Sequence, residues 1–465
     1  MRSRVGNVSV IACSTGRVQR PRPALLGLLA AGAVEVYLAH RTTLPGGIVE
    51  RKYALLAEIM LWWVAFGCAV LCVRRLPRRT VVLTVLALAV VLRIAAVSER
   101  APLSDDLYRY AWDGIVQHDG TNPYRYAPRA DELADLRYTD GSDWLWPREW
   151  IGESPDSRIN RTNVHTIYPP VAEAWFYAAH AVIPLSAEDR GYEALGFVVD
   201  LAVLAVLLSL LRSRGRDERW IALYALAPLP ALEAVQNAHV DGLAVLAVLG
   251  ALALWPRRPA WSAAVLCVAA LIKIYPGILV LLMLRARDTR LRVLAAFTAV
   301  GLLAYLPHYL AIGTMLFGYL PGYLGEEKYD EGTRYLLVGL TGLSGTPATV
   351  VVLVALLALL VGLFRSDLPL ETAGVVLLVG VFLLVTPVQP WYSLLLIALA
   401  TLTGAWWAVP VAIASYPLFF ATILGAEGPA LGRVSYGIAA LVVLLAYLRS
   451  RRTQPVPAIA AGRPG

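Results

Sequence analysis

The residues with the clearest chemical potential lie in one polar segment of an otherwise apolar chain. Residues 104–126 read SDDLYRYAWDGIVQHDGTNPYRY, a stretch rich in carboxylates, aromatic rings and arginines. Adjacent carboxylates such as Asp105 and Asp106 raise each other's pKa unless a cation or hydrogen bonds intervene, which suits a general base or a metal site. An Asp-Asp pair at a helix start is also a good N-cap, so these two residues alone leave both interpretations open.

Neighbouring side chains favour the functional interpretation. Asp106, Tyr110 and Asp113 follow helical spacing, so one helix face could present a carboxylate, a phenol and a second carboxylate. Flat aromatic faces stack on sugar rings, and guanidinium groups offer forked donors to phosphate. The remaining candidates of this segment are Tyr108 and Trp112 for stacking, Arg109 and Arg125 for phosphate, Asn122 and Tyr124 at a turn, and His165 and Tyr168 where the polar segment ends.

Three other places interrupt the apolar pattern. The turn QNAHVD at 236–241 joins two apolar runs, and a tight turn is the alternative explanation for its Asn and Asp. The pair His239 and Asp241 in so short a turn suggests the lining of a cavity, so Asn237, His239 and Asp241 are predicted to contact substrate. Lys273 lies within an apolar run, where a lysine costs roughly 2.5–3.5 kcal/mol, so it is either a structural lysine, paired or snorkelling, or a ligand for a lipid phosphate. The adjacent Tyr275, with Gln389 and Trp391 of a third turn, completes the predicted substrate contacts; an interfacial aromatic belt is the default explanation for that turn.

A metal site has weaker support. The chain has no HExxH or cysteine-based metal pattern, and His165 and His239 come from separate loops. No cofactor is therefore predicted with certainty, and a divalent cation stays possible.

The composition indicates the class of protein. The chain has 465 residues, of which 58% are hydrophobic, and a mean hydropathy of +0.61. Apolar runs long enough to cross the bilayer recur from residue 24 to residue 449, which predicts an all-α polytopic membrane protein with about 12–14 transmembrane helices. The net charge of +8 comes from arginines in short loops between apolar runs, so we expect a lipid bilayer as partner and no nucleic acid.

The basic loops also predict the topology. Because arginine-rich loops stay inside, the acidic segment faces out, and the protein is a multi-pass cell-membrane protein with an extracytoplasmic site. The predicted parts are a basic tail, three membrane helices, a large structured outer loop, a core membrane module, a second outer loop, C-terminal membrane helices and a second tail, at 1–23, 24–97, 98–169, 170–312, 313–346, 347–449 and 450–465.

At two places the chain cannot simply cross the membrane with each apolar run in turn and still keep every basic loop inside. If 170–185 and 193–211 both crossed the membrane, the basic loop after them would lie outside, so one of them should lie flat or enter only part-way. Residues 262–283 also lie between two basic loops, which predicts a re-entrant pair of short helices turning at 274–277.

These features together resemble the GT-C superfamily of glycosyltransferases that use polyprenyl-phosphate sugars. The likeness is strongest to bacterial polyprenol-phosphate-mannose mannosyltransferases and to the catalytic subunit that adds the first mannose to GPI anchors. It depends on SDDLYRY, on APLPALEAVQNAHVDG around 227–242 and on LIKIYPG at 271–277, and it covers about residues 95–285. The chain departs from the pattern in having Asp-Asp where some relatives have Asp-x-Asp, and in two extra spans before the acidic loop.

The resemblance implies an activity and two residue roles. An aspartate in the pattern Asp-Leu-x-x-Tyr is the general base of such enzymes, which corresponds to Asp106 with Asp105 beside it, and a basic residue near the lipid phosphate corresponds to Lys273. The expected reaction is the inverting transfer of a sugar from a polyprenyl-phosphate carrier to a glycolipid or polysaccharide, with mannose as the expected sugar. The alternative is a transporter or lipid flippase, which would spread polar residues along a path reaching both membrane faces.

Overall fold

Helices make up the regular structure of this protein. The computed structural model describes residues 21–99, 103–139, 141–146, 157–326, 334–424 and 428–452, and these residues contain no β-strand. Eight helical segments among them are long and apolar enough to cross a membrane. Their helices are α1 (Pro21–Thr42), α2 (Ile48–Val73), α3 (Arg78–Ala96), α6 (Asp189–Ser213), α11 (Arg290–Ile312), α14 (Gly345–Phe364), α17 (Val409–Leu424) and α18 (Gly428–Arg452). The predicted all-α polytopic class is therefore confirmed.

The number of full crossings differs from the expected 12–14. A ninth crossing arises only if the bent pair of η4 (Pro230–Gln236) and α8 (Asp241–Leu254) counts as one span. Three more apolar segments are shorter helices: α9 (Pro259–Ile272), α15 (Leu370–Val385), and η8 (Pro390–Tyr392) with α16 (Ser393–Thr403). Apolar composition alone does not distinguish these short helices from full spans, which explains the higher prediction.

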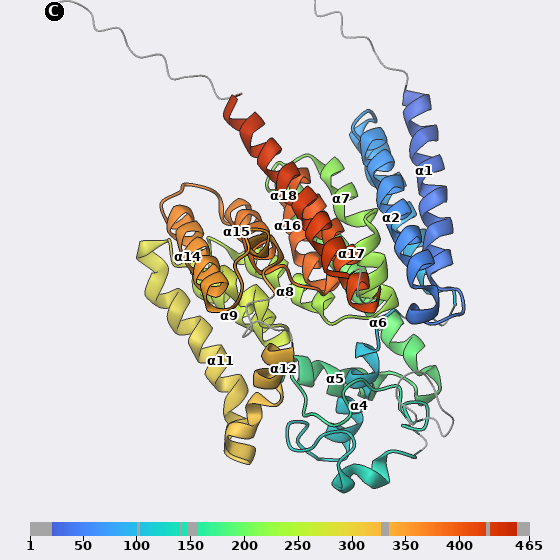
Figure 1. The fold of residues 1–465 in the computed structure, drawn as a ribbon, viewed down its shortest axis with the longest axis vertical. Coiled ribbons are helices and arrows are strands. Elements are labelled where there is room, and N and C mark those ends of the chain that lie inside the picture. Colours follow the sequence, from blue (N-terminus) through green and yellow to red (C-terminus); the bar gives the residue numbers. More distant parts are fainter. Residues whose placement is uncertain are drawn as a thin grey trace, which may run out of the picture.

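The molecule has two layers (Figure 1). The long helices stand side by side, and both the start of α1 and the end of α18 lie at the end remote from α4 (Asp106–His118). The second layer contains α4, α5 (Pro170–Val182) and the irregular segments around them. The acidic segment predicted to form a large loop thus lies at one end of the helix bundle.

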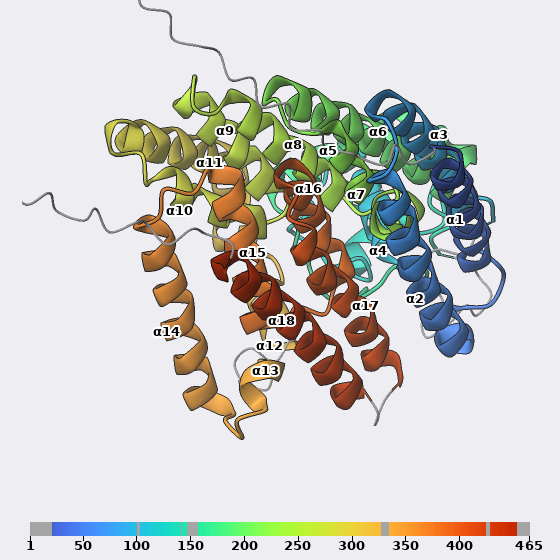
Figure 2. The same ribbon diagram turned by 90° about the horizontal axis from the view of Figure 1, so that it is seen from above.

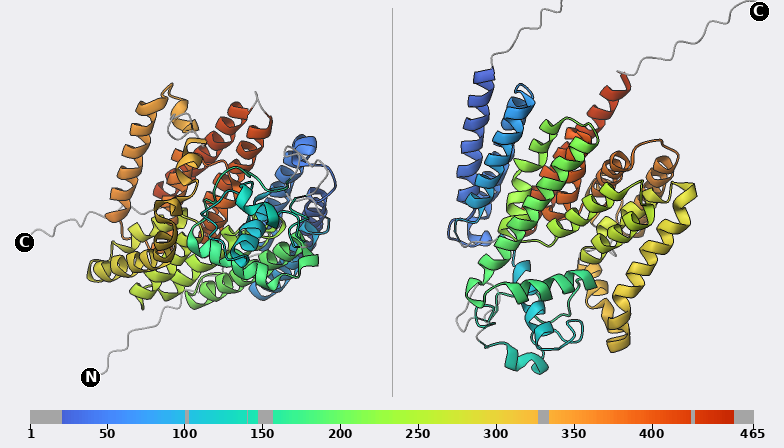
Figure 3. Two further views of the ribbon diagram at one scale, coloured as in Figure 1. Left: turned by 90° about the horizontal axis from the view of Figure 1, so that it is seen from below. Right: turned by 180° about the vertical axis from the view of Figure 1, so that it is seen from behind.

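The two places where alternation fails correspond to short helices. The run 193–211 falls within the long α6, whereas α5 has 13 residues, a length of about 20 Å, and lies across the ends of the long helices (Figure 3). At the second place, α9 ends at Ile272, and the chain turns through η5 (Tyr275–Leu279) into α10 (Val280–Met283).

Aromatic packing holds α4 and α5 together. Tyr110 stacks on Phe176 with ring centroids 4.5 Å apart, and Trp112 meets Trp146 edge-on at 5.3 Å. Such pairs contribute about 0.5–1.5 kcal/mol each beyond their buried area. Gly114 permits the close approach, because a Cβ there would lie 2.7 Å from the Phe176 carbonyl oxygen. The start of α4 is consequently held on a packed base.

A buried ion pair joins the N-terminal helices to the core. Arg93 Nε of α3 donates to Asp200 Oδ2 of α6 at 2.8 Å, and both side chains are fully buried. The Tyr224 hydroxyl donates to the other oxygen of Asp200 at 2.9 Å. A pair with this many hydrogen bonds fixes α3, and the acidic segment that follows α3, relative to α6.

Candidate active site

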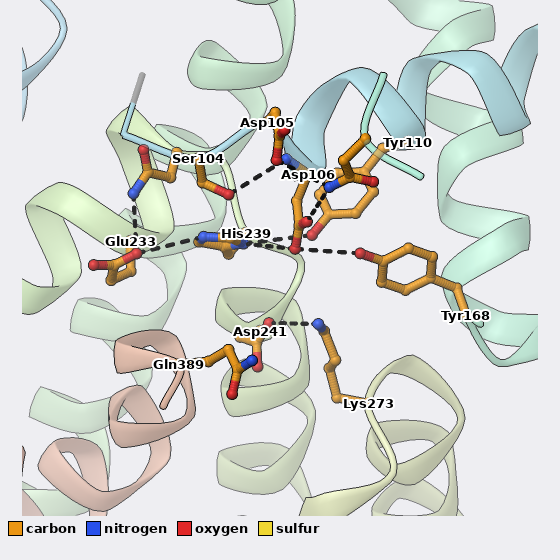
Figure 4. Close-up of polar contacts among 12 residues, drawn as sticks. Ser104, Asp105, Asp106, Tyr110, Tyr168, Glu233, His239, Asp241, Lys273 and Gln389 are labelled. Carbon is orange, nitrogen blue, oxygen red and sulfur yellow. Dashed lines mark hydrogen bonds and ion pairs between the residues drawn. The ribbon is translucent and has the colours of Figure 1, made fainter. Parts of the chain in front are cut away.

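Asp106 occupies the first position of α4, where the helix dipole favours an anion. Asn160 Nδ2 donates to Asp106 Oδ1 at 2.8 Å and to Asp105 Oδ1 at 3.0 Å, and the Tyr168 hydroxyl donates to Asp106 Oδ2 at 3.3 Å (Figure 4). Asp105 is the N-cap residue, but its side chain makes no capping hydrogen bond. Capping therefore does not explain this acidic pair.

The two aspartates differ in their surroundings. Asp105 is an exposed residue, but protein atoms surround much of its carboxyl group. This burial raises the pKa of Asp105 above its usual value, and the adjacent Asp106 raises it further. The side chain of Asp106 is 16% exposed and points toward His239. Asp106 is thus the carboxylate of the pair that faces the interior cluster.

His239 lies between two carboxylates. Its Nδ1 is 3.6 Å from Asp106 Oδ2, and its Nε2 is 3.4 Å from Glu233 Oε2. The Tyr110 hydroxyl is 3.5 Å from the same Nδ1, and the Trp391 ring stacks on the imidazole with centroids 4.0 Å apart. The imidazole is fully buried, and it lies between the carboxylates of Asp106 and Glu233 with one ring nitrogen toward each.

An irregular backbone places His239 there. The segment η4 is a π-helix, a form that frequently occurs at functional sites, and the next helix, α8, is bent from it by 110°. Between them Ala238 has φ of +50°, a strained conformation for a residue with a side chain, and His239 N donates to the Glu233 carbonyl at 2.9 Å. A Cβ at Gly196 would lie 2.3 Å from the Ala234 carbonyl oxygen, so α6 can approach η4 only with glycine at this position.

Glu233 is held as a hydrogen-bond acceptor. The Tyr416 hydroxyl donates to Oε1 at 2.8 Å, and Asn237 Nδ2 donates to Oε2 at 3.0 Å. Asn237 Oδ1 in turn accepts from Leu103 N at 2.8 Å, which ties the acidic segment to the membrane helices. The predicted residue Asn237 therefore positions both Glu233 and the chain just before Asp105.

Lys273 is the C-cap residue that follows α9, and it lies directly beside His239 and the two carboxylates. Its Nζ is 3.3 Å from Asp241 Oδ2, and it lies over the Tyr168 ring at 5.1 Å and the Tyr392 ring at 5.9 Å. The Asp241 side chain is fully buried and that of Lys273 is 12% exposed. Because the Tyr168 hydroxyl also donates to Asp106, the acid contacts the hydroxyl and the ammonium lies over the ring of the same tyrosine (Figure 4).

Several predicted contacts lie away from this cluster. Asp113 is seven residues beyond Asp106, hence about 10 Å further along α4, and it forms a buried ion pair with Arg109 at 3.0 Å. This pairing occupies Arg109, and Trp112 is part of the aromatic core. Four others have structural contacts: Asn122 with His308, Tyr124 with the Tyr168 carbonyl, Arg125 over Tyr126, and Tyr275 against Tyr392. His165 has no hydrogen-bond or ion-pair partner among the described residues. Gln389, in contrast, belongs to the cluster drawn in Figure 4, and its Nε2 also donates to the Tyr323 hydroxyl.

Other residues of the cluster carried weak or overlooked sequence signals. Glu233 is a carboxylate within an apolar stretch, so the argument that singles out Lys273 applies to it equally. Asn160 lies in an irregular segment, where nothing in the sequence marks it as a partner of the aspartates. Within the described residues, no group of three or more His, Cys, Asp or Glu side chains is arranged to hold a metal ion.

Glu173 forms a second acidic cluster with Asp113 beneath the site. Thr166 Oγ1 and Gln117 Nε2 donate to its two oxygens at 2.8 and 3.0 Å. Burial raises the pKa of Glu173 well above its usual value, and the nearby Asp113 carboxylate raises it further. Burial also raises the pKa of Asp113, and Arg109 opposes that shift. We infer that Glu173 holds its proton to a higher pH than an ordinary glutamate does, and that Asp113 carries the charge that pairs with Arg109.

The Glu173→Gln substitution should flatten the pH dependence of stability. The native state keeps a proton that an unfolded glutamate releases above a pKa of about 4.3, so native stability falls as the pH rises from there toward the raised pKa. The slope is at most about 1.4 kcal/mol per pH unit for one proton. Thermal unfolding from pH 5 to pH 8 should show a shallower decline for Glu173→Gln than for the wild type. The exposed Glu132→Gln variant is the control, and parallel curves for all three proteins would contradict the assignment.

Comparison with known proteins gives one match. Residues 166–387, just under half of the chain, match the model of glycosyltransferase family 87. The matched range contains Tyr168, Glu233, His239, Asp241 and Lys273, and it begins after Asp105 and Asp106. No curated protein and no solved structure matches the chain.

Proposed function

We propose that this protein is a membrane glycosyltransferase that moves a sugar from a polyprenyl-phosphate carrier to a glycolipid or polysaccharide, with inversion at the anomeric carbon and with mannose as the expected sugar. The match to a glycosyltransferase family supports the reaction class. The resemblance of the acidic and KIYP motifs supports the lipid carrier and mannose. The arginine-rich loops, which lie at the opposite end of the bundle from α4, support the outer-face location of the site.

One observation carries the proposal: an acid and an ammonium meet at Tyr168. Asp106 accepts from the Tyr168 hydroxyl at 3.3 Å, and Lys273 Nζ lies 5.1 Å from the centroid of the same ring. A transferase that uses a sugar phosphate needs a base for the acceptor hydroxyl and a cation for the departing phosphate. The two groups here are close enough to contact opposite ends of the sugar–phosphate unit.

In the proposed step, Asp106 removes the proton of an acceptor hydroxyl while the hydroxyl oxygen attacks the anomeric carbon. The bond from that carbon to the phosphate oxygen breaks, and its electrons leave with the polyprenyl phosphate. Single displacement inverts the configuration, as in inverting hydrolysis with the acceptor in place of water. Positive charge that develops on the sugar is stabilised by the carboxylates, and negative charge on the leaving phosphate by Lys273.

His239 and Glu233 offer a route for the proton after transfer. The imidazole links Asp106 to Glu233 through contacts of 3.6 and 3.4 Å. A histidine between two carboxylates can accept a proton on one nitrogen and release one from the other. Glu233 is then a positioning residue that orients His239 and stabilises its charged form.

The Glu233→Gln substitution should lower kcat by about 10–100-fold with little change in KM, the size of effect found when a group that orients a metal-bound histidine is replaced. Glutamine keeps the size of the side chain and can still accept from Tyr416, but it cannot stabilise a protonated His239. The measurement is steady-state release of polyprenyl phosphate. Glu193→Gln is the matched control, because Glu193 is also buried and pairs with Arg190 away from the cluster. A change in KM alone, or an equal loss in both variants, would exclude this role.

The reaction class is tested with purified protein and a panel of donors. Polyprenyl-phosphate mannose, glucose and arabinose are each incubated with the protein and a mixture of membrane glycolipids. Protein-dependent release of polyprenyl phosphate together with a glycosylated product is the expected result. Vesicles in which the protein moves solute or lipid across the membrane, with no sugar transferred from any donor, would instead support a transporter.

A further inference from the structure

A second site lies at the opposite end of the helix bundle from Asp106. A cavity of about 330 Å³ opens where α2 ends, beside η3 (Glu218–Ile221) and α7 (Ala222–Ala225). Figure 2 shows α2, α7 and α16 near one another in the view from above. Pockets for small ligands commonly measure about 300–1,000 Å³, so the cavity is large enough for part of a lipid.

The lining of this cavity combines apolar, aromatic and charged side chains. Val70, Val73, Ala222 and Leu223 form its apolar part, and Trp220, Arg74 and the Arg219–Asp217 pair also line it. Trp406, which is 46% exposed, marks the rim. The position of Trp220 is tightly fixed, because a Cβ at Gly404 would lie 2.8 Å from its ring. Tryptophan at the ends of membrane helices is typical of the zone where lipid headgroups meet hydrocarbon.

Arg74 supplies a cation at the rim that no carboxylate of the described residues neutralises. Its guanidinium lies over Trp220 at 5.6 Å and Trp406 at 6.0 Å, so two rings hold it beside the opening. The neighbouring Arg219 is different, since it pairs with Asp217 at 2.7 Å and also donates to the Arg74 carbonyl at 3.3 Å. The fixed positive charge available to a ligand is therefore that of Arg74.

We propose that this cavity binds an anionic phospholipid of the cytoplasmic leaflet. The lipid phosphate would contact Arg74, and the glycerol and upper acyl chain would fill the space between Val70, Val73 and Leu223. Basic pockets between membrane helices on the cytoplasmic side bind anionic headgroups in this way. The orientation follows from the arginine-rich loops at this end of the bundle and does not depend on the transfer reaction.

The test is native mass spectrometry of delipidated full-length protein titrated with phosphatidylglycerol. The wild type should bind phosphatidylglycerol in preference to phosphatidylcholine. Arg74→Gln should weaken this binding about fivefold or more, the contribution of one basic residue near an anionic surface. The matched control is Arg75→Gln, an exposed arginine of the same loop, which should stay within about twofold of the wild type.

A cavity-filling variant, Val70→Trp, tests the apolar part of the site independently of charge. It should also lose phosphatidylglycerol binding while the protein stays monodisperse in gel filtration. Equal losses in Arg74→Gln and Arg75→Gln would reduce the effect to general attraction by the basic loop and overturn the proposal. Unchanged binding in Val70→Trp, equal binding of phosphatidylcholine, or displacement by polyprenyl phosphate at lower concentrations would also overturn it.

Discussion

Asp106→Asn should reduce sugar transfer by about 10²–10⁴-fold, the contribution of a positioned general base. Asparagine has nearly the same shape, and its single oxygen can still accept from either Asn160 or Tyr168, which donate to different oxygens of Asp106, but it cannot take a proton from the acceptor. The loss should therefore appear in kcat, with the protein still folded in membranes. Release of polyprenyl phosphate measures kcat, and thermal unfolding checks the fold.

Asp105→Asn is the matched control for this substitution. Asp105 shares the Asn160 amide with Asp106, but no other hydrogen bond to its carboxylate comes from the interior cluster. We expect a loss of less than about tenfold, well below that of a removed base. A larger loss in Asp105→Asn than in Asp106→Asn would exchange the two roles, and near-normal turnover of Asp106→Asn would exclude it as the base.

Lys273→Met should lower transfer by about 10²–10³-fold, as is found when one stabilising donor is removed from a developing anion. Binding of the lipid donor should weaken as well, because the phosphate loses its cation. The single variant has a second effect. Asp241 is fully buried and would be left without its ion-pair partner, which typically costs about 3–5 kcal/mol of stability.

The double variant Lys273→Met/Asp241→Asn separates these effects. Neutralising both partners removes the buried unpaired charge, so thermal stability should return most of the way to that of the wild type. Transfer should remain low, because the phosphate ligand is still missing. If the double variant transferred sugar at the wild-type rate, Lys273 would have only a structural role. Loss of solute movement across vesicles, with donor binding unchanged, would favour the transporter.

The class of fold was predictable because the membrane imposes length and composition on each helix. Runs of apolar residues and basic loops were enough to predict a polytopic helical protein. The expected 12–14 exceeds the eight long apolar helices of the described residues because α9, α15 and α16 are as apolar as the long helices but shorter. The conflict between the basic loops and a simple alternation of membrane sides pointed to residues 170–185 and 262–283, which contain the short α5 and the turn after Lys273.

Local spacing explains part of the difference between predicted and observed site contacts. Arg109 and Asp113 are four residues apart on a helix, a spacing that favours an ion pair between them over a free phosphate ligand. Asp113 is also two turns beyond Asp106, which takes it to another cluster despite the shared helix face.

Non-local contacts explain the rest. The convergence of Asp106, His239 and Lys273 joins α4, the segment after η4 and the end of α9, and no local pattern fixes the distances between such elements. The stacking of Trp391 on His239 and the bonds from Asn160 are of the same kind. Charged or polar residues within apolar runs indicate which residues have a function, whereas only the fold shows their partners.

The central claim is that the sugar phosphate binds between Asp106 and Lys273, and an experimental structure with a non-reactive donor tests it most directly. A polyprenyl-phosphonate analogue of the mannose donor is suitable, because its carbon link cannot be cleaved. We expect the phosphonate oxygens about 3 Å from Lys273 Nζ, a normal charge-assisted contact, with the anomeric carbon on the Asp106 side of Tyr168. A donor whose phosphonate lies away from Lys273, or whose sugar points away from Asp106, would contradict the claim.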